Sequence, residues 1–262
     1  MGVLVTGACS SGEQAAAPTF STKEPGVLVV AADLPVPGFW EGDDPKAVDA
    51  GYEWGLADAL ADRFDLRLEV IDRPFDRIVS GDLGAADVGI AQASITDERR
   101  EDVDFSVSYF TSSPTVVTRA DDLDDLVDLA TAREQTWAVQ RGTTEADLIT
   151  DVVRPDDDPV YADDETAATQ LVADGKADAA LIDLPTALVI TDQDPDLAVR
   201  SRFDQEEHYG VVLPLDSDNT PVIDQAIRAL RADETLLHLR ERWLDPVFSE
   251  DPDSIPVISF SD

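Results

Sequence analysis

Short apolar runs alternate with segments of helical periodicity along most of this chain. The first run, residues 26–32, is uninterrupted and rich in valine, which is typical of a buried strand. Apolar and aromatic residues then recur at helical spacing over residues 52–64. Strands that are joined by helices form parallel sheets with helices on both faces, so the chain is predicted to be an α/β protein.

The same alternation continues towards the C-terminus. Residues 32–40 contain two prolines and a glycine, which predicts a loop after the first strand. Further strands are predicted at 66–70, 87–91, 115–118, 136–139, 179–182 and 209–213. Further helices are predicted over 123–129, after Gly142, and over 165–174, 184–192, 223–230 and 236–243.

The charge balance excludes several classes of function. The 262 residues include 56 Asp and Glu but only 19 Lys and Arg, a formal net charge of −37. Nucleic-acid binding needs a basic face, and anionic lipid would repel such a surface. No apolar run reaches the roughly 18 residues of a membrane-spanning helix. One cysteine and two histidines leave little for a disulfide, a metal site or a Ser-His-Asp hydrolase, so no metal or cofactor is expected.

Two explanations of the acidity stay open. Only Lys23, Lys46 and Lys176 are lysine, and many carboxylates with few lysines suit a protein that works in concentrated salt. Charges there are screened within about 3 Å, so self-repulsion matters little. An ordinary acidic protein from a GC-rich genome, in which arginine codons are favoured, would have the same composition.

A cysteine follows a short apolar segment near the N-terminus. Residues 3–9 are Val-Leu-Val-Thr-Gly-Ala-Cys, and small residues just before a cysteine resemble the end of a prokaryotic lipoprotein signal. Cys9 is therefore the expected lipidation site, and an incidental cysteine in a tail is the alternative. Residues 12–25 are small, polar and proline-containing, which suits a tether, so residues 1–25 are taken as a lipobox-like segment with a flexible tether.

The most specific stretch is residues 94–110, Ser-Ile-Thr-Asp-Glu-Arg-Arg-Glu-Asp-Val-Asp-Phe-Ser-Val-Ser-Tyr-Phe. It resembles the signature of the amino-acid-binding family of extracytoplasmic solute-binding proteins, the receptors of ABC importers. That family has Thr-Ile-Thr-x-Glu-Arg and then Val-Asp-Phe-Ser-x-x-Tyr-Tyr at this separation. Further family landmarks follow in order over residues 26–244: Asp33, Phe75, 141–144, 177–183, 209–211 and 242–244.

The resemblance implies a two-lobed periplasmic-binding-protein-like fold. Two mixed, mostly parallel sheets with helices on both faces would be joined by a two-strand hinge, with the ligand between the lobes. Residues 26–113 and 208–262 would form lobe one, and residues 114–207 would form lobe two.

The resemblance also implies residues for the two poles of a zwitterion. Arg99 matches the arginine that binds the ligand carboxylate, and its planar guanidinium can do so with two parallel hydrogen bonds. Ser94 and Thr144 match residues that assist it, and Gln92 stands where only a backbone carbonyl is used. Asp183 matches the aspartate that binds the ammonium group. The alternatives are a surface role for Arg99 and helix capping, by Thr143 or Thr144 at one helix and by Asp183 at another.

The expected side-chain pocket is made of four residues. Phe75 matches an aromatic that packs on the ligand, with a place in the core as its alternative. Asp33 matches an acid that meets polar or cationic side chains, and Gln140 stands at a polar position. Relatives usually have an aromatic where this chain has Val36, so Phe39 or the neighbouring Trp40 is expected to supply the missing ring.

The expected ligand is a neutral polar or cationic amino acid, because two candidate site acids and the net charge disfavour an anionic one. The chain is expected to be a monomeric, extracytoplasmic receptor that closes on its ligand and delivers it to an ABC permease. Its only membrane contact would be the lipid on Cys9. The alternatives are a cyclohexadienyl-dehydratase-like enzyme with Glu145 as general acid, a ligand-sensing module, and a purely structural module.

Overall fold

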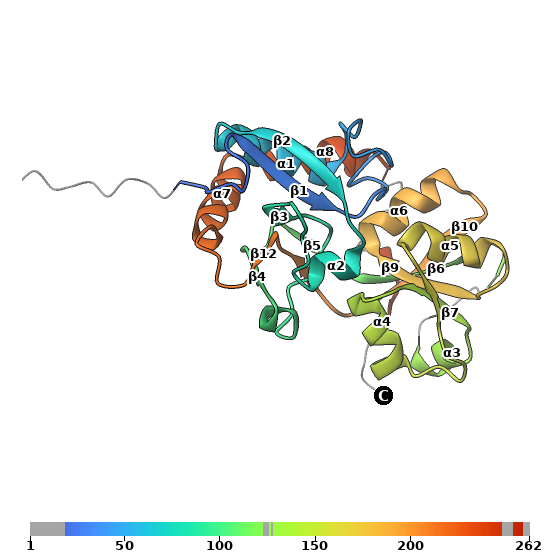
Figure 1. Cartoon of the computed structure of the whole chain (residues 1–262). Coiled ribbons are helices and arrows are strands. Elements are labelled where there is room, and N and C mark those ends of the chain that lie inside the picture. Colours follow the sequence, from blue (N-terminus) through green and yellow to red (C-terminus); the bar gives the residue numbers. More distant parts are fainter. Residues whose placement is uncertain (1–18, 123–125, 127, 248–253, 259–262) are drawn as a thin grey trace, which may run out of the picture.

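The computed structural model describes residues 19–122, 126, 128–247 and 254–258 of the chain. Two main sheets, each with its own helices, form two lobes (Figure 1). Each sheet combines parallel and antiparallel pairs, which confirms the predicted two-lobed α/β fold. Cys9 lies outside the described residues.

Lobe one is built on a five-stranded sheet that contains the first predicted strand. β1 (Val27–Ala32) is buried along its whole length and pairs in parallel with a strand on each side. The last two strands of the sheet run antiparallel to their neighbours. The sheet order is β2 (Arg67–Asp72), β1, β3 (Val88–Gly89), β12 (Val212–Pro214) and β4 (Val103–Phe105).

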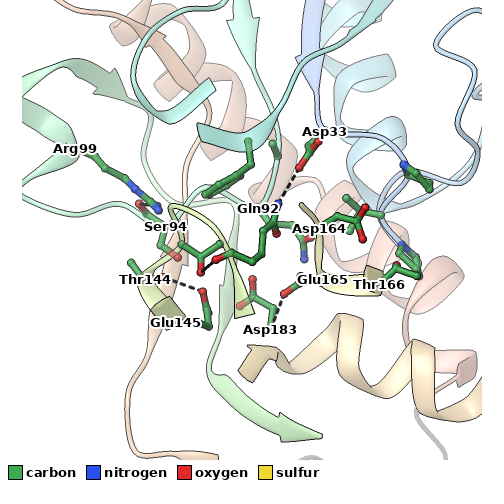
Figure 2. Close-up of a pocket in the computed structure, with 17 residues that line it drawn as sticks. Asp33, Gln92, Ser94, Arg99, Thr144, Glu145, Asp164, Glu165, Thr166 and Asp183 are labelled. Atoms are coloured by element: carbon green, nitrogen blue, oxygen red, sulfur yellow. Dashed lines mark hydrogen bonds between the residues drawn. The ribbon is translucent and has the colours of Figure 1, made fainter. Parts of the chain in front are cut away.

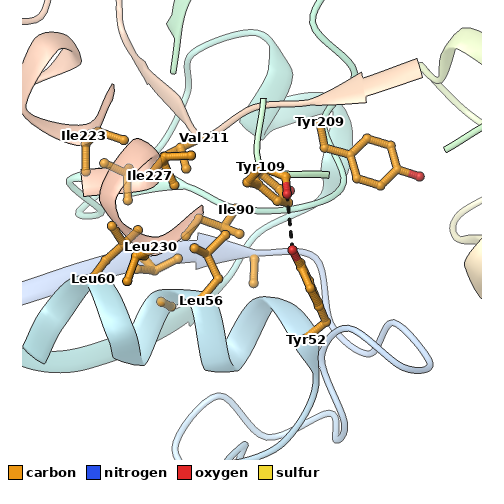
Figure 3. Close-up of a cluster of buried hydrophobic side chains, with 14 of the residues drawn as sticks. Tyr52, Leu56, Leu60, Ile90, Tyr109, Tyr209, Val211, Ile223, Ile227 and Leu230 are labelled. Carbon is orange, nitrogen blue, oxygen red and sulfur yellow. Dashed lines mark hydrogen bonds between the residues drawn. The ribbon is translucent and has the colours of Figure 1, made fainter. Parts of the chain in front are cut away.

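The core of lobe one joins the N-terminal and C-terminal parts of the chain. Leu56 and Leu60 of α1 (Tyr52–Arg63) are fully buried beside Ile223 and Ile227 of α7 (Thr220–Ala232) (Figure 3). Full burial of such side chains contributes roughly 1.5–3 kcal/mol each. The other helices of this lobe are α2 (Phe75–Val79), the 3₁₀ turn Arg99–Glu101, α8 (Thr235–Trp243) and the 3₁₀ turn Asp245–Val247.

Lobe two has a six-stranded sheet with Trp137 and Leu181 in its core. The sheet order is β13 (Val257–Ile258), β10 (Leu197–Phe203), β6 (Pro114–Arg119), β9 (Ala179–Asp183), β7 (Trp137–Gln140) and β8 (Val160–Ala162). Its helices are α3 (Leu129–Arg133), α4 (Thr144–Leu148) with a following π turn (Ile149–Val153), α5 (Glu165–Ala173) and α6 (Leu184–Gln193).

A separate two-stranded sheet lies on the path of the chain between the lobes. β5 (Phe110–Ser112) and β11 (Glu207–Tyr209) pair antiparallel, with His208 opposite Thr111. β5 leads into β6 of lobe two, and β11 follows β10 of the same lobe. The chain therefore passes between the lobes at these two strands, which correspond to the expected two-strand hinge.

Three expectations about elements are corrected by the structure. The single strand expected at 209–213 is two strands in different sheets, because β11 pairs with β5 whereas β12 pairs with β3 and β4. Residues 257–258, expected in lobe one, pair with β10 of lobe two. The helix expected over 123–129 begins at Leu129, where the Asp128 side chain caps it, and residues 123–125 and 127 lie outside the described part.

None of the helices in the described part of the chain has the length and apolar character needed to cross a membrane.

Candidate functional site

A pocket between the two lobes brings the predicted site residues together (Figure 2). Its empty volume is about 490 Å³, which includes space that is open to solvent. Eight of the nine predicted ligand-binding residues line it: Asp33, Phe75, Gln92, Ser94, Arg99, Gln140, Thr144 and Asp183.

Phe39 is the exception, and the structure corrects this expectation. Its side chain is fully buried in the core of lobe one, where its ring lies edge-on to Tyr52 and Phe110, and it does not line the pocket. Trp40 is likewise fully buried in that core. Val36 lines the pocket at the position of the missing aromatic. Phe75 satisfies both alternatives, because it lines the pocket and also packs in a lobe-one core cluster.

Hydrogen bonds cross between the lobes around this pocket. The Arg99 guanidinium donates to the backbone oxygen of Gly142 at 3.1 Å, and the Gln140 amide donates to Asp33 at 3.0 Å. The Gln92 amide donates to the Thr186 hydroxyl at 3.2 Å. The lobes are therefore closed over the pocket in this structure.

Arg99 lies at the start of a short 3₁₀ turn in lobe one, on the rim of the pocket. Its guanidinium carbon is 5.2 Å from the centre of the Phe75 ring, and one nitrogen donates to the Ser94 backbone oxygen at 2.9 Å. Burial lowers the pKa of Arg99 and outweighs the opposite effect of the nearby carboxylates of Glu145 and Glu207. Two of its five N–H donors are used by backbone oxygens, which leaves donors for a bound carboxylate.

Asp183 ends the buried strand β9 and precedes α6. It occupies the N-cap position of that helix, but its side chain makes no capping hydrogen bond. Its carboxylate instead accepts a hydrogen bond from the Ser112 hydroxyl at 2.9 Å and lines the pocket. Burial raises the pKa of Asp183 well above its ordinary value, and Glu165 and Glu207 raise it further.

The residues at the start of α4 both cap the helix and line the pocket. Thr143, and not Thr144, is the N-cap, and its hydroxyl accepts from the backbone N–H of Ala146 at 3.2 Å. The Thr144 side chain is thus left to face the pocket, where its hydroxyl donates to Glu207 at 3.0 Å.

Four acidic residues of this region were not among the predicted ligand-binding residues: Glu145, Asp164, Glu165 and Glu207. Glu145, considered above only as a general acid, and Glu207 lie with Asp183 in a buried cluster, in which one carboxylate oxygen of each residue is within 4.8 Å of the others. Such a group of oxygens can hold a cation. Burial is the main cause that raises the pKa of Glu145, and Glu207 is the next.

A signal for Glu207 exists in the sequence. In the strand β11 side chains alternate between the two faces, so Glu207 and Tyr209 are buried while His208 is exposed. The neighbouring Glu206 has a side chain that is 80% exposed. Without the strand register, the Glu-Glu pair is indistinguishable from a solvated surface pair.

A second acidic group lies on the side of the pocket opposite Asp183 (Figure 2). Burial raises the pKa of Asp33 to about 7, and the neighbouring carboxylates of Asp72 and Asp164 also raise it. Deeper in lobe two, burial raises the pKa of Glu165 to about 8, although its carboxylate accepts from the Asp183 backbone N–H at 2.8 Å.

A buried carboxylate in lobe one supports the pocket wall from behind. Glu53 accepts hydrogen bonds from the Trp40 indole and the Gln92 backbone N–H, each at 2.7 Å, and from the Tyr109 hydroxyl. Gln92 has a φ of 49°, in the left-handed region that a non-glycine residue rarely adopts. The bond to Glu53 holds that conformation, which directs the Gln92 amide across the pocket to Thr186.

Comparison with known proteins gives a consistent result. The family model described as bacterial extracellular solute-binding proteins, family 3, matches residues 28–246. The L-cystine-binding protein TcyJ of Escherichia coli K12 is 28% identical over 225 residues, 84% of each chain.

Solved structures of amino-acid-binding proteins are also similar to this chain. An arginine-bound mutant of ArgBP from T. maritima has a TM-score of 0.71 and 29% identity, and the alignment covers 78% of this chain and 96% of that one. The ancestral amino acid-binding protein AncCDT-1, a precursor of cyclohexadienyl dehydratase, has a TM-score of 0.74 and 25% identity over 84% and 95% of the two chains.

Proposed function

Because the chain belongs to family 3 of the bacterial extracellular solute-binding proteins, we propose that it binds an amino acid with a cationic side chain between its lobes and presents it to an ABC permease. The observation that carries the choice of ligand is the charge of the pocket. Among the described residues that line it, Arg99 is basic, while Asp33, Glu145, Asp164, Glu165 and Asp183 are acidic. A net-cationic ligand offsets this excess, whereas glutamate would add to it.

In this proposal the two poles of the ligand backbone meet opposite charges. The α-carboxylate is held by the Arg99 guanidinium with the Ser94 and Thr144 groups beside it. The α-ammonium is held at Asp183. Because Asp33 lies across the pocket from Asp183, with Asp164 as a charged neighbour, a cationic side chain extends towards them (Figure 2).

Closure follows from the position of the hinge. Rotation about β5 and β11 brings Gly142 and Thr186 of lobe two against Arg99 and Gln92 of lobe one. Water is then excluded from the charged contacts, which strengthens them. The closed molecule is the form that a permease would recognise. Its expected place is outside the cytoplasmic membrane, held by a lipid on Cys9.

Calorimetry and thermal shift against a panel of L-arginine, L-lysine, L-glutamine, L-cystine and L-glutamate test the proposal, each at low and high salt. A ligand at about 100 times its Kd adds about 2.7 kcal/mol of stability, so binding is easily detected. Arginine or lysine is expected to bind best. If glutamate binds best, the choice of ligand is wrong, and if no amino acid binds, the proposed function is wrong.

Gln92→Ala is expected to lower ligand affinity only a few-fold. The change removes the Gln92–Thr186 hydrogen bond of the closed form, and one neutral hydrogen bond contributes about 0.5–1.5 kcal/mol. Thr186→Val should have a similar effect, and the double variant should be no weaker than either single one. Additive losses in calorimetry would mean that the two side chains do not act through this shared contact.

The dehydratase alternative is favoured by one observation. Glu145 lines the pocket, is buried, and has a raised pKa, as a general acid must. The fold of AncCDT-1, a precursor of a dehydratase, is similar to the fold of this chain. Turnover of a cyclic dienyl acid that is lost in Glu145→Gln would support this function over binding alone.

A further inference from the structure

Three carboxylates from three different elements meet at one buried point of the pocket region. Glu145 belongs to α4, Asp183 ends β9, and Glu207 lies on the hinge strand β11. They are 4%, 7% and 4% exposed, and one oxygen of each lies within 4.8 Å of the other two. Buried like charges at this separation are unfavourable unless a cation or protons neutralise them.

In the described part of the chain, Arg99 acts electrostatically on all three carboxylates but forms no ion pair with them. None of the ion pairs found there includes any of the three carboxylates. The guanidinium of Arg99 is near, but its recorded hydrogen bonds go to the backbone oxygens of Ser94 and Gly142. One Glu145 oxygen, Oε1, is fully buried and has no hydrogen-bond partner. Glu145 lies beside Asp183 (Figure 2), so an acceptor remains unused in the cluster.

The size of the cluster fits one nitrogen atom. Three oxygens that lie within 4.8 Å of one another share a point that is at most about 2.8 Å from each, so one nitrogen there is within N–H···O reach of all three. A primary ammonium has three N–H donors and no acceptor, so each donor can meet one carboxylate. Calcium would need six to eight oxygens, and the three carboxylates offer one oxygen each in this arrangement.

We propose that Glu145 and Glu207 join Asp183 in binding a single primary ammonium group of the ligand. This rests on the proposed function and deepens it. The site would then select unsubstituted ammonium groups and reject N-methylated and quaternary solutes such as betaines, which lack the three donors. Glu207 also accepts hydrogen bonds from the hydroxyls of Ser94 in lobe one and Thr144 in lobe two.

The test compares L-arginine with Nα-methyl-L-arginine and Nα-trimethyl-L-arginine by calorimetry. The variants are Glu145→Gln and Glu207→Gln, which keep the shape of the side chain, and Glu206→Gln is the matched control because the Glu206 side chain is exposed. Wild type and Glu206→Gln should bind arginine at least 100-fold more tightly than the trimethyl compound. Each of the other variants should bind arginine at least 10-fold more weakly and show a smaller preference for it.

Folding is followed by thermal melts, because neutralising a buried acid is expected to leave the melting temperature unchanged or higher. Wild-type arginine affinity in both Gln variants would overturn the inference, and so would equal affinity for the trimethyl compound. Calcium chloride alone is a further arm: calcium binding that Glu207→Gln abolishes while arginine affinity is unchanged would overturn the ammonium assignment. Absence of any amino-acid binding by wild type would refute the proposed function itself.

Discussion

Arg99→Ala is expected to weaken ligand binding roughly 30-fold or more. The change leaves a ligand carboxylate without its charged partner in a closed pocket, and truncation of one member of a buried, hydrogen-bonded charge pair costs about 2–5 kcal/mol. Each 1.4 kcal/mol is about tenfold in Kd. The variant also loses the inter-lobe hydrogen bond to Gly142, so the closed form itself is less favoured.

Two further variants make the measurement specific. Arg100→Ala is the matched control, because Arg100 is exposed and its guanidinium lies over the Phe105 ring, away from the pocket. Arg99→Lys keeps the charge but loses the planar fork, so its affinity should fall between those of wild type and Arg99→Ala. Calorimetric affinity for arginine that is the same in wild type and Arg99→Ala would remove Arg99 from the site.

The ligand-free protein is expected to lose stability as the pH rises from 5 to 8.5. Burial raises the pKa of Glu53 and Asp33 to about 7 and that of Glu165 to about 8. A raised pKa means that the folded state binds the proton more tightly than the unfolded chain. The stabilisation is therefore complete below the unfolded pKa of about 4–4.5 and is lost as the pH passes 7 to 8.

The expected size of this effect is several kcal/mol. Each unit of pKa difference corresponds to about 1.4 kcal/mol, so the three groups together should lower the melting temperature by roughly 10 °C or more over this range. The free energy of unfolding should be measured with urea in 1 M salt. The salt screens the repulsion that arises from the net charge of −37, and it affects the buried groups much less. Constant or rising stability would contradict the assignment.

Glu165→Gln provides the control for the pH effect. The amide resembles the protonated acid, so this variant should lose its share of the pH dependence and be more stable than wild type at pH 8.5. A cationic ligand acts in the opposite direction to the protons, since it favours ionised carboxylates. Saturating arginine is therefore expected to stabilise the protein more at pH 8.5 than at pH 5, in terms of free energy of unfolding.

The sequence predicts most of the fold because its elements are marked by local chemistry. The valine-rich run of β1 and the helical spacing of α1 and α7 appear in the structure close to their predicted bounds. Local chemistry does not show where the chain passes from one sheet to another. The buried run at 209–213 has no charged residue, so only the pairing partners show where β11 ends and β12 begins.

The candidate site, like the fold, was predicted from the sequence only in part. The resemblance over residues 94–110 and its landmarks led to eight residues that the structure brings to one pocket. Phe39 was expected there because an aromatic was missing at Val36, but the loop turns that ring into the lobe-one core. The burial of Glu207 beside the pocket residues Ser94 and Thr144 was not expected, because it depends on the register of a three-residue hinge strand, which only pairing with β5 fixes.

The hinge position of Glu207 affects the order of events during capture. Points near a rotation axis move least, so a side chain on β11 keeps nearly the same place while the outer walls swing through large arcs. An entering molecule would thus find this carboxylate already in position before Thr144 and the rest of the far wall arrive. First recognition would then occur at the pivot, and the outer walls would come into contact with the molecule afterwards.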